Sequence, residues 1–177
     1  VFAWMLAVTI DHLQTAAFLS DLIPSSTPVE WMPAVVFILA AIVSFSTGSS
    51  WSTMAILYPL CIPVVLSLAT DGGANTDPSV YMPVLLQIIS VVLCASVMGD
   101  HCSPISDTTV MSSMATQCDH VTHVRTQLPY ALLVGGVSFF CGCVLYAFGS
   151  PWYINFILGF GLLTVVFFLL SKPNEVQ

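Results

Sequence analysis

Long apolar runs alternate with short polar breaks along this chain. Near its end, the runs 129–148 and 152–170 are uninterrupted and are joined by the short sequence Gly-Ser-Pro. At about 1.5 Å per residue, each run can span a hydrocarbon core of roughly 30 Å. A run over 1–23 is also long enough, although Asp11 and His12 lie at its middle. We therefore expect a transmembrane helix over 1–23 and a hairpin of two such helices at the other end.

Residues 31–69 have a different pattern, in which two shorter apolar pieces flank the hydroxyl-rich stretch SFSTGSSWST. These pieces, 31–45 and 53–69, are near or below the length that crosses a bilayer. No charged residue occurs from Trp31 to Thr70, whereas a cytoplasmic loop normally attracts Lys or Arg. We therefore favour a re-entrant hairpin, with its tip inside the membrane, over two complete crossings.

Residues 81–120 are predicted to form a broken helix. The apolar run ends at Met98 and is followed by GDHCSPISDTT, where Gly99 frees the backbone and Pro104 removes a donor. Non-helical backbone at membrane depth must be buried in protein or line a watery cavity, so two such interruptions predict a cavity. The run from Tyr81 alone covers ~27 Å, which leaves the break at either the membrane middle or the cytoplasmic mouth.

Composition indicates a membrane protein. The chain is 57% hydrophobic and only 6% charged, with a mean hydropathy of +0.96, whereas soluble domains carry about 25% charge. The net charge of −7 excludes nucleic acid as a natural partner. We expect an all-α, polytopic integral protein of the lipid bilayer, with the cell membrane as its location. Because Val1 already lies in an apolar run without an initiator Met, we interpret the chain as part of a longer protein.

The few charges predict an orientation. Arg125 and Lys172 flank the last hairpin, and the positive-inside rule places them in the cytoplasm. The loops 21–30 and 70–79 contain acidic residues and no Lys or Arg. Tracing the crossings back from Arg125 places both loops on the opposite face.

The stretch GDHCSPISDTT contains the groups of a cation and proton site. Unwound carbonyls and a carboxylate can replace the hydration shell of a small cation. A carboxylate in a poorly hydrated cavity holds its proton more readily than in water, so Asp100 and Asp107 are candidates for exchanging a proton for a metal ion. His101 could relay protons. Asp107 could instead be only the N-cap of a following helix. The neutral oxygens beside these groups belong to Ser103, Ser106, Thr108 and Thr109.

Three other polar positions lead to weaker expectations. SFSTGSSWST has no ionisable group, so it would supply hydroxyl and backbone ligands around a turn at Gly48, or else be a plain polar loop. Asp11 is an intramembrane acid and hence a functional candidate, although it could face a partner helix. The cluster Cys118, Asp119, His120 and His123 has no spacing of a closed zinc site, and we expect no metal there.

Two of these segments resemble the NhaC-type Na+/H+ antiporter family. They are TGSSWSTMAILYP (47–59) and GDHCSPISDTT (99–109), and the opening AWMLAVTIDHLQTAAFL resembles the helix that precedes the hairpin in that family. The resemblance extends over essentially the whole chain. It implies two inverted repeats, each with a re-entrant hairpin and a discontinuous helix that meet near the membrane middle. This chain would hold most of the second repeat, and the N-terminal half of the protein would be its missing partner.

The resemblance also implies a site and an activity. The hairpin tip would be Thr47, Gly48, Ser49 and Ser50. The broken-helix site would be Gly99, Asp100, His101, Ser103, Ser106, Asp107 and Thr108, with Na+ held by Asp100 and Asp107. The implied activity is secondary active Na+/H+ antiport, with no cofactor and no enzymatic reaction, and the architecture is compatible with a homo-oligomer.

Other activities remain open from the sequence. The same family contains exchangers of organic anions, such as malate for lactate with Na+. Because a dicarboxylate usually needs an Arg or Lys clamp and the chain has two basic residues, we favour Na+ for H+. An intramembrane enzyme lacks support, since there is no HExxH or GxSxG sequence. A third hypothesis is that the fragment is inactive without its N-terminal half.

Overall fold

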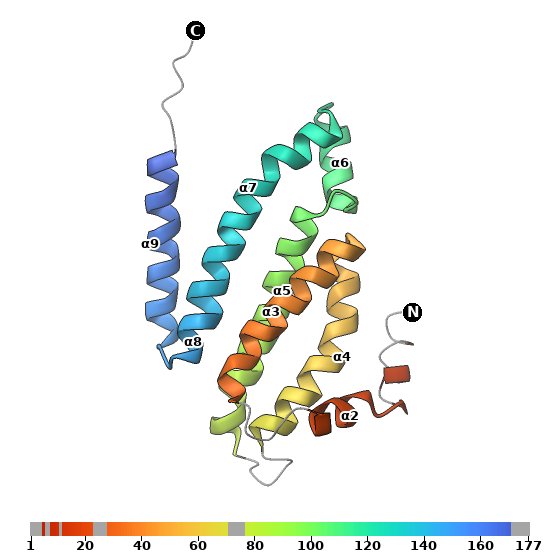
Figure 1. The fold of residues 1–177 in the computed structure, drawn as a ribbon, viewed down its shortest axis with the longest axis vertical. Coiled ribbons are helices and arrows are strands. Elements are labelled where there is room, and N and C mark those ends of the chain that lie inside the picture. The colour runs from red at the N-terminus through yellow and green to blue at the C-terminus, as the bar shows by residue number, and fades with distance from the viewer. Residues whose placement is uncertain (1–4, 6–7, 11, 23–27, 71–76, 171–177) are drawn as a thin grey trace.

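The computed structural model in Figure 1 is a bundle of helices. It describes residues 5, 8–10, 12–22, 28–70 and 77–170, and within these ranges there is no strand. The elements are α2 (Thr15–Leu22), η1 (Val29–Trp31), α3 (Met32–Thr47), α4 (Ser50–Ala69), α5 (Pro78–Cys102), α6 (Asp107–Ala115), α7 (His120–Ser138), the π-helical η2 (Phe139–Val144), α8 (Leu145–Ala147) and α9 (Trp152–Leu170).

Five helical segments of the described part are long and apolar enough to cross a membrane. They are Val29–Thr47, Ser50–Ala69, Tyr81–Cys102, His120–Ala147 and Trp152–Leu169. Most side chains of the last segment are exposed, including Phe156, Phe160 and Phe167, as expected of a helix that faces lipid. The prediction of an all-helical, multi-pass integral membrane protein is confirmed.

The predicted hairpin over 31–69 is formed by α3 and α4, which are joined by Gly48 and Ser49 alone. Gly48 ends α3 in the left-handed conformation (φ +64°), and its N–H donates to the carbonyl of Ser44 at 2.8 Å. Ser49 is the N-cap of α4, where its hydroxyl accepts a hydrogen bond from the backbone of Ser52. Most of the polar stretch SFSTGSSWST is therefore helical, and only its centre is a turn.

Small residues allow α3 and α5 to pack closely. Ala40 and Ser44 on α3 and Ala95 and Ser96 on α5 are all completely buried, and the Ser44 hydroxyl donates to the Ser96 carbonyl. A Cβ built on Gly99 would lie 2.5 Å from the carbonyl oxygen of Ala41. Without side-chain bulk between them, the two backbones approach within contact distance.

The first apolar run differs from its prediction. A turn at Leu13 and Gln14, with Gln14 at φ +52°, separates α2 from the residues before it. α2 is only eight residues long and packs on the lower end of α4 (Figure 1). The described part of 1–23 is thus not one continuous helix, and Asp11 lies outside the described residues.

The helix predicted from Pro129 begins earlier, at His120. Asp119 is its N-cap, with its carboxylate accepting hydrogen bonds at 2.9 Å from both the N–H and the hydroxyl of Thr122. These two hydrogen bonds hold the pKa of Asp119 below its ordinary value, and the bond from the Thr122 N–H has the larger effect. This cap therefore stabilises α7 fully at pH values above the ordinary Asp pKa. The stabilisation is lost as the pH falls through the lowered pKa of Asp119.

Candidate functional site

The carboxylate of Asp100 is the centre of a small cluster of oxygens. Asp100 lies in the last turn of α5 and is 4% exposed. The Ser106 hydroxyl donates to its Oδ1 at 2.7 Å, and the Thr108 hydroxyl donates to its Oδ2 at 3.2 Å. The two hydroxyl oxygens are themselves 2.8 Å apart. Residues from the end of α5, the following turn and the start of α6 are thus brought together around this carboxylate.

A tight turn over 103–106 separates α5 from α6. The N–H of Ser103 donates to the backbone carbonyl of Asp100 at 3.1 Å, and the N–H of Ser106 donates to the carbonyl of Ser103. The Ser103 hydroxyl accepts a hydrogen bond from the N–H of Ile105, and Ser103 is completely buried. Pro104 has no N–H and cannot continue α5 through this point. These contacts fix the position of Ser106 relative to Asp100.

The hairpin tip lies against this turn. A Cβ built on Gly48 would lie 2.9 Å from the carbonyl oxygen of Ile105, so the two backbones are in direct contact. Thr47 lies 3.3 Å from the Thr53 hydroxyl within the hairpin. Ser49 and Ser50 are half-buried, and no hydrogen bond of the described residues joins them to 99–109. The tip therefore contacts the turn through its backbone.

Two predicted site residues lie apart from the cluster. His101 is exposed, and its Nδ1 lies 2.9 Å from the carbonyl of Val97 on its own helix. Asp107 is exposed at the first position of α6, and in the described part no hydrogen bond joins it to Asp100. Ser106, not Asp107, occupies the N-cap position, so the capping interpretation is wrong. Asp107 instead lies in the first turn of α6, where a negative charge interacts favourably with the helix dipole.

Two buried hydroxyls near the cluster have no hydrogen-bond partner among the described residues. They belong to Ser96, one helical turn before Asp100, and to Thr109, which follows Thr108 on α6. Thr109 was expected as a neutral oxygen of the site, but Ser96 was not. Its spacing of four residues from Asp100 places both on one side of α5, which is the signal that could have identified it.

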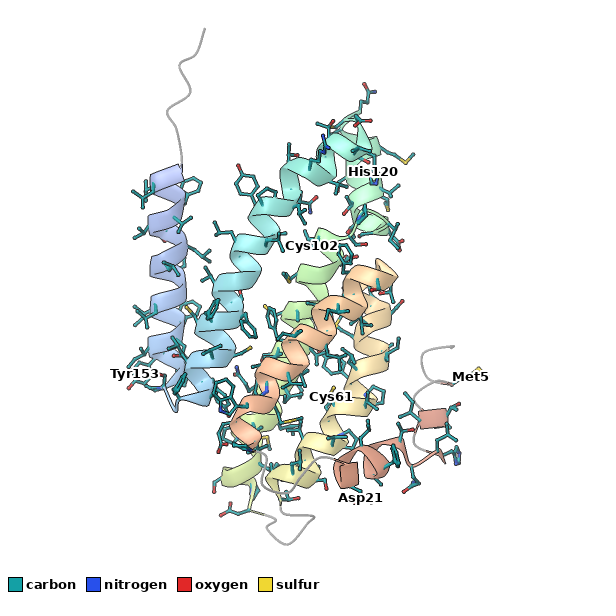
Figure 2. The ribbon with its side chains drawn as sticks, in the orientation of Figure 1. Met5, Asp21, Cys61, Cys102, His120 and Tyr153 are labelled. Carbon is teal, nitrogen blue, oxygen red and sulfur yellow. The ribbon has the colours of Figure 1, made fainter. Side chains whose placement is uncertain are left out.

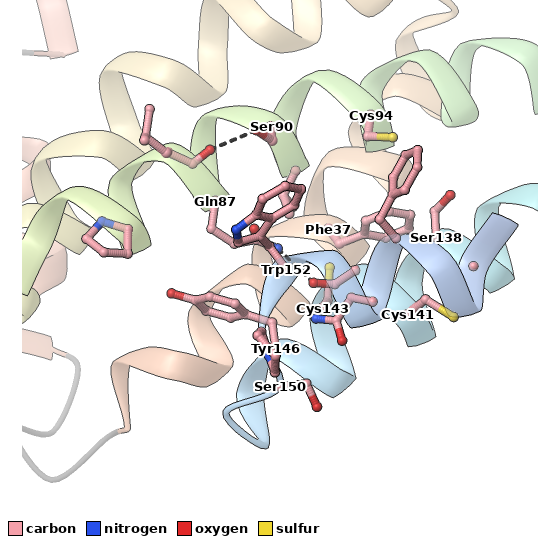
Figure 3. A pocket seen from close by; sticks show the side chains of 18 of the residues that line it. Phe37, Gln87, Ser90, Cys94, Ser138, Cys141, Cys143, Tyr146, Ser150 and Trp152 are labelled. Carbon is pink, nitrogen blue, oxygen red and sulfur yellow. Dashed lines mark hydrogen bonds between the residues drawn. The ribbon is translucent and has the colours of Figure 1, made fainter.

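A cavity of about 1130 Å³ lies elsewhere, between α5, η2 and α9 (Figure 3). Gln87 crosses it and donates from Nε2 to the carbonyl of Gly142 at 2.7 Å. Its lining includes Trp152 and Tyr146 but no Asp, Glu, His, Lys or Arg. A site without these groups cannot hold a cation by charge or transfer a proton near neutral pH, so Asp100 remains the candidate site.

The family model of the Na+/H+ antiporter family matches residues 1–149. The chain belongs to the Na+/H+ antiporter family. The matched residues include the hairpin, the turn 103–106 and the Asp100 cluster, and the match confirms the resemblance at the level of the Na+/H+ antiporter family.

Two relatives of this chain are much longer than the chain itself. The chain is 41% identical over 133 residues to an uncharacterised protein of Haemophilus influenzae, covering 75% of the chain and 23% of that protein. It is 32% identical over 110 residues to the arginine/ornithine antiporter ArcD of Halobacterium salinarum, covering 60% of the chain and 20% of that protein. The chain thus spans less than a quarter of the length of either relative. No solved structure matches it.

Proposed function

We propose that this antiporter exchanges Na+ for H+ at Asp100. The observation that carries the proposal is a buried carboxylate whose hydrogen-bond partners, among the described residues, are only the hydroxyls of Ser106 and Thr108. A buried negative charge needs a compensating positive charge or a proton. Since no Lys, Arg or His bonds to this carboxylate in the described part, a cation or a proton would fill that role.

Counting hydrogens supports a proton-bound state. Three oxygen–oxygen contacts, of 2.7, 2.8 and 3.2 Å, connect Asp100, Ser106 and Thr108 in a ring. The two hydroxyls have one hydrogen each, which is enough for two contacts. A proton on the Asp100 carboxyl would supply the third. Loss of that proton leaves a ring of oxygens with a negative charge, which is the chemistry that a small hard cation requires.

The cation would be bound by the Asp100 carboxylate and neighbouring neutral oxygens. The Ser106 and Thr108 hydroxyls can rotate their hydrogens away and present lone pairs, since a hydroxyl is both donor and acceptor. The unpartnered hydroxyls of Ser96 and Thr109 are further candidate ligands. Because Na+ and H+ would use the same carboxylate, they would compete, and competition at one moving site produces antiport. Asp107, if it takes part, would be a second acid at the edge of the site.

We also propose that the hairpin is re-entrant and that α5 and α6 form one discontinuous helix. The hairpin tip contacts the turn 103–106 through Gly48, while α6 and the start of α7 extend beyond that level (Figure 1). If α6 and the start of α7 reach the membrane surface, the tip and the turn lie below it. Irregular backbone at that depth must be buried in protein or line a polar cavity, and such a cavity would be the ion pathway.

A cationic amino acid is the second candidate substrate. The Halobacterium relative is named an arginine/ornithine antiporter, and a guanidinium or ammonium group would also pair with the Asp100 carboxylate. An organic anion such as malate fits less well, because the chain has nine acidic and two basic residues. The transporting unit would require the rest of the polypeptide, which the relatives have.

The deciding experiment uses the full-length protein reconstituted in liposomes with a pH-sensitive dye inside. An imposed Na+ gradient should drive proton movement in the opposite direction, and external arginine, ornithine, malate or lactate should not reduce it. Arginine-driven exchange without Na+-driven proton movement would move the assignment to the second candidate. Exchange driven by malate or lactate alone would contradict a cation site at Asp100.

Removing one hydroxyl of the ring should weaken the site without abolishing it. Ser106→Ala removes the shorter contact to Asp100, and we expect the KM for Na+ to rise by about fivefold to tenfold, the factor that corresponds to one lost hydrogen bond. Ser112→Ala, on the exposed side of α6, is the matched control and should transport normally. Equal KM values for the wild type and Ser106→Ala would remove this hydroxyl from the site.

A further inference from the structure

His120 connects three consecutive pieces of the chain. It is the first residue of α7 and lies where α7 meets α6 (Figure 2). Its ring is half-buried and both ring nitrogens have partners. Nε2 lies 2.7 Å from the carbonyl oxygen of Pro104, in the turn beside Asp100, and Nδ1 lies 3.2 Å from the Ser113 hydroxyl on α6.

The hydrogens of these contacts determine which form of the ring satisfies all of them. The Pro104 carbonyl can only accept, so Nε2 must carry a hydrogen. The Ser113 hydroxyl has one hydrogen, which it donates to the carbonyl of Val110 at 2.8 Å. If Ser113 is to keep both this bond and its contact with Nδ1, then Nδ1 must donate as well. A neutral ring has only one N–H, and Ser113 must then choose between Val110 and Nδ1. The doubly protonated ring therefore keeps one hydrogen bond more than the neutral ring.

Several ionisable groups surround this ring. The segments that meet at this ring have the following ionisable residues: Cys118, Asp119, His123 and Arg125 on its own segment, Asp100, His101 and Cys102 at the end of α5, and Asp107 on α6. Asp119, the adjacent residue, has an electrostatic interaction with His120 that favours opposite charges on the pair. Asp119 is thus an acidic neighbour that favours a positive charge on His120.

We propose that His120, in its doubly protonated form, is a positioning residue that holds the turn 103–106 in place beside Asp100. The inference rests on the proposed cation site. Pro104 follows Ser103, whose N–H donates to the Asp100 backbone, and precedes Ser106 by two positions. A displaced Pro104 carbonyl therefore moves the Ser106 hydroxyl away from the carboxylate. Because histidine changes charge between about pH 5 and 8, acidity at this end of the bundle would control how firmly the turn is held.

The contact between His120 and the Pro104 carbonyl is called the clamp below. Hydrogen exchange of the full-length protein tests the clamp without any transported ion. At pH 6, His120→Ala should speed exchange of the amides of 103–108 by about fivefold to tenfold, after correction for intrinsic rates. His120→Gln keeps one donor for the Pro104 carbonyl, so its exchange rate should lie between those of the wild type and His120→Ala. The ratio of this rate to the intrinsic exchange rate should not change from pH 6 to pH 8. The matched control is His123→Gln, one helical turn along α7, whose side chain has no hydrogen bond in the described part.

Transport measurements test the consequence for the site. In the wild type, raising the pH removes proton competition at Asp100 and also releases the clamp. The first effect lowers the KM for Na+ and the second raises it. His120→Gln should remove the effect of the clamp, so that the KM for Na+ of this variant falls more steeply as the pH rises. Its maximal rate should stay close to that of the wild type. His123→Gln should reproduce the wild-type profile.

The two experiments separate this inference from the proposed function. Wild-type exchange rates at 103–108 in both His120 variants, or equal acceleration in His123→Gln, would overturn the clamp whatever the protein transports. Faster exchange in His120→Ala together with no Na+-driven proton movement by the wild type would support the clamp and contradict Na+/H+ antiport.

Discussion

Replacing Asp100 with Asn should reduce Na+-driven proton movement to background, a loss of about 100-fold or more. The side chain keeps its size and can still accept from Ser106, but it can neither titrate nor supply the negative charge that binds a cation. The factor corresponds to ~3 kcal/mol, the upper range for a hydrogen-bonded charge. The measurement is dye-reported proton flux by the full-length protein in liposomes.

The matched control is Asp77→Asn. Asp77 is the exposed N-cap at the other end of the same helix, and Asn caps a helix as well as Asp does. The N–H of Ser79, followed by its hydroxyl, holds the Asp77 pKa below its ordinary value, so this carboxylate stays ionised throughout the assay. Flux in Asp77→Asn should equal that of the wild type. Normal flux in Asp100→Asn would overturn the proposed site, and Asp107→Asn would show whether a second acid is required.

Replacing Gly99 with Ala should destabilise the full-length protein by about 3 kcal/mol. The new methyl group would lie 2.5 Å from the Ala41 carbonyl oxygen and 2.8 Å from the Ser44 Cβ, and backbone atoms cannot move aside as a flexible side chain can. The expected result is separation of α3 from α5, with loss of transport, because the next residue along α5 is Asp100. Thermal unfolding in detergent micelles measures the change.

Gly136→Ala is the control for added bulk in a helix. Gly136 lies in α7, and a Cβ there would have no atom within 4 Å. Since Ala favours a helix over Gly, the protein should become more stable, by up to about 1 kcal/mol. Equal melting temperatures for Gly99→Ala and the wild type would mean that α3 and α5 do not approach each other as closely as the structure describes.

The sequence was sufficient for the features that depend on local composition. Apolar runs of sufficient length predicted the membrane class, and Pro104 predicted an interruption that the structure places at 103–106. The partners of Asp100 could be chosen because Ser106 and Thr108 lie directly across that interruption. That the interruption lies inside the membrane stays a prediction.

Three features of the structure lay outside the expectations from the sequence. The turn at Gln14 follows the polar residues Asp11 and His12, but the length of the apolar run favoured a continuous helix there. The apolar run predicts a helix from Pro129, yet the Asp119 cap starts α7 at His120. Ser96 is a single hydroxyl in an apolar helix, and its relevance appears only when α5 places it one turn from Asp100.

The contact between Gly48 and Ile105 has a consequence for how the protein could move. With no side chain between the two backbones, the turn cannot approach α3 and α4 further, and any displacement of the turn in that direction pushes the hairpin as a rigid unit. Occupancy at Asp100 and the position of the hairpin would thus be mechanically coupled over one van der Waals contact.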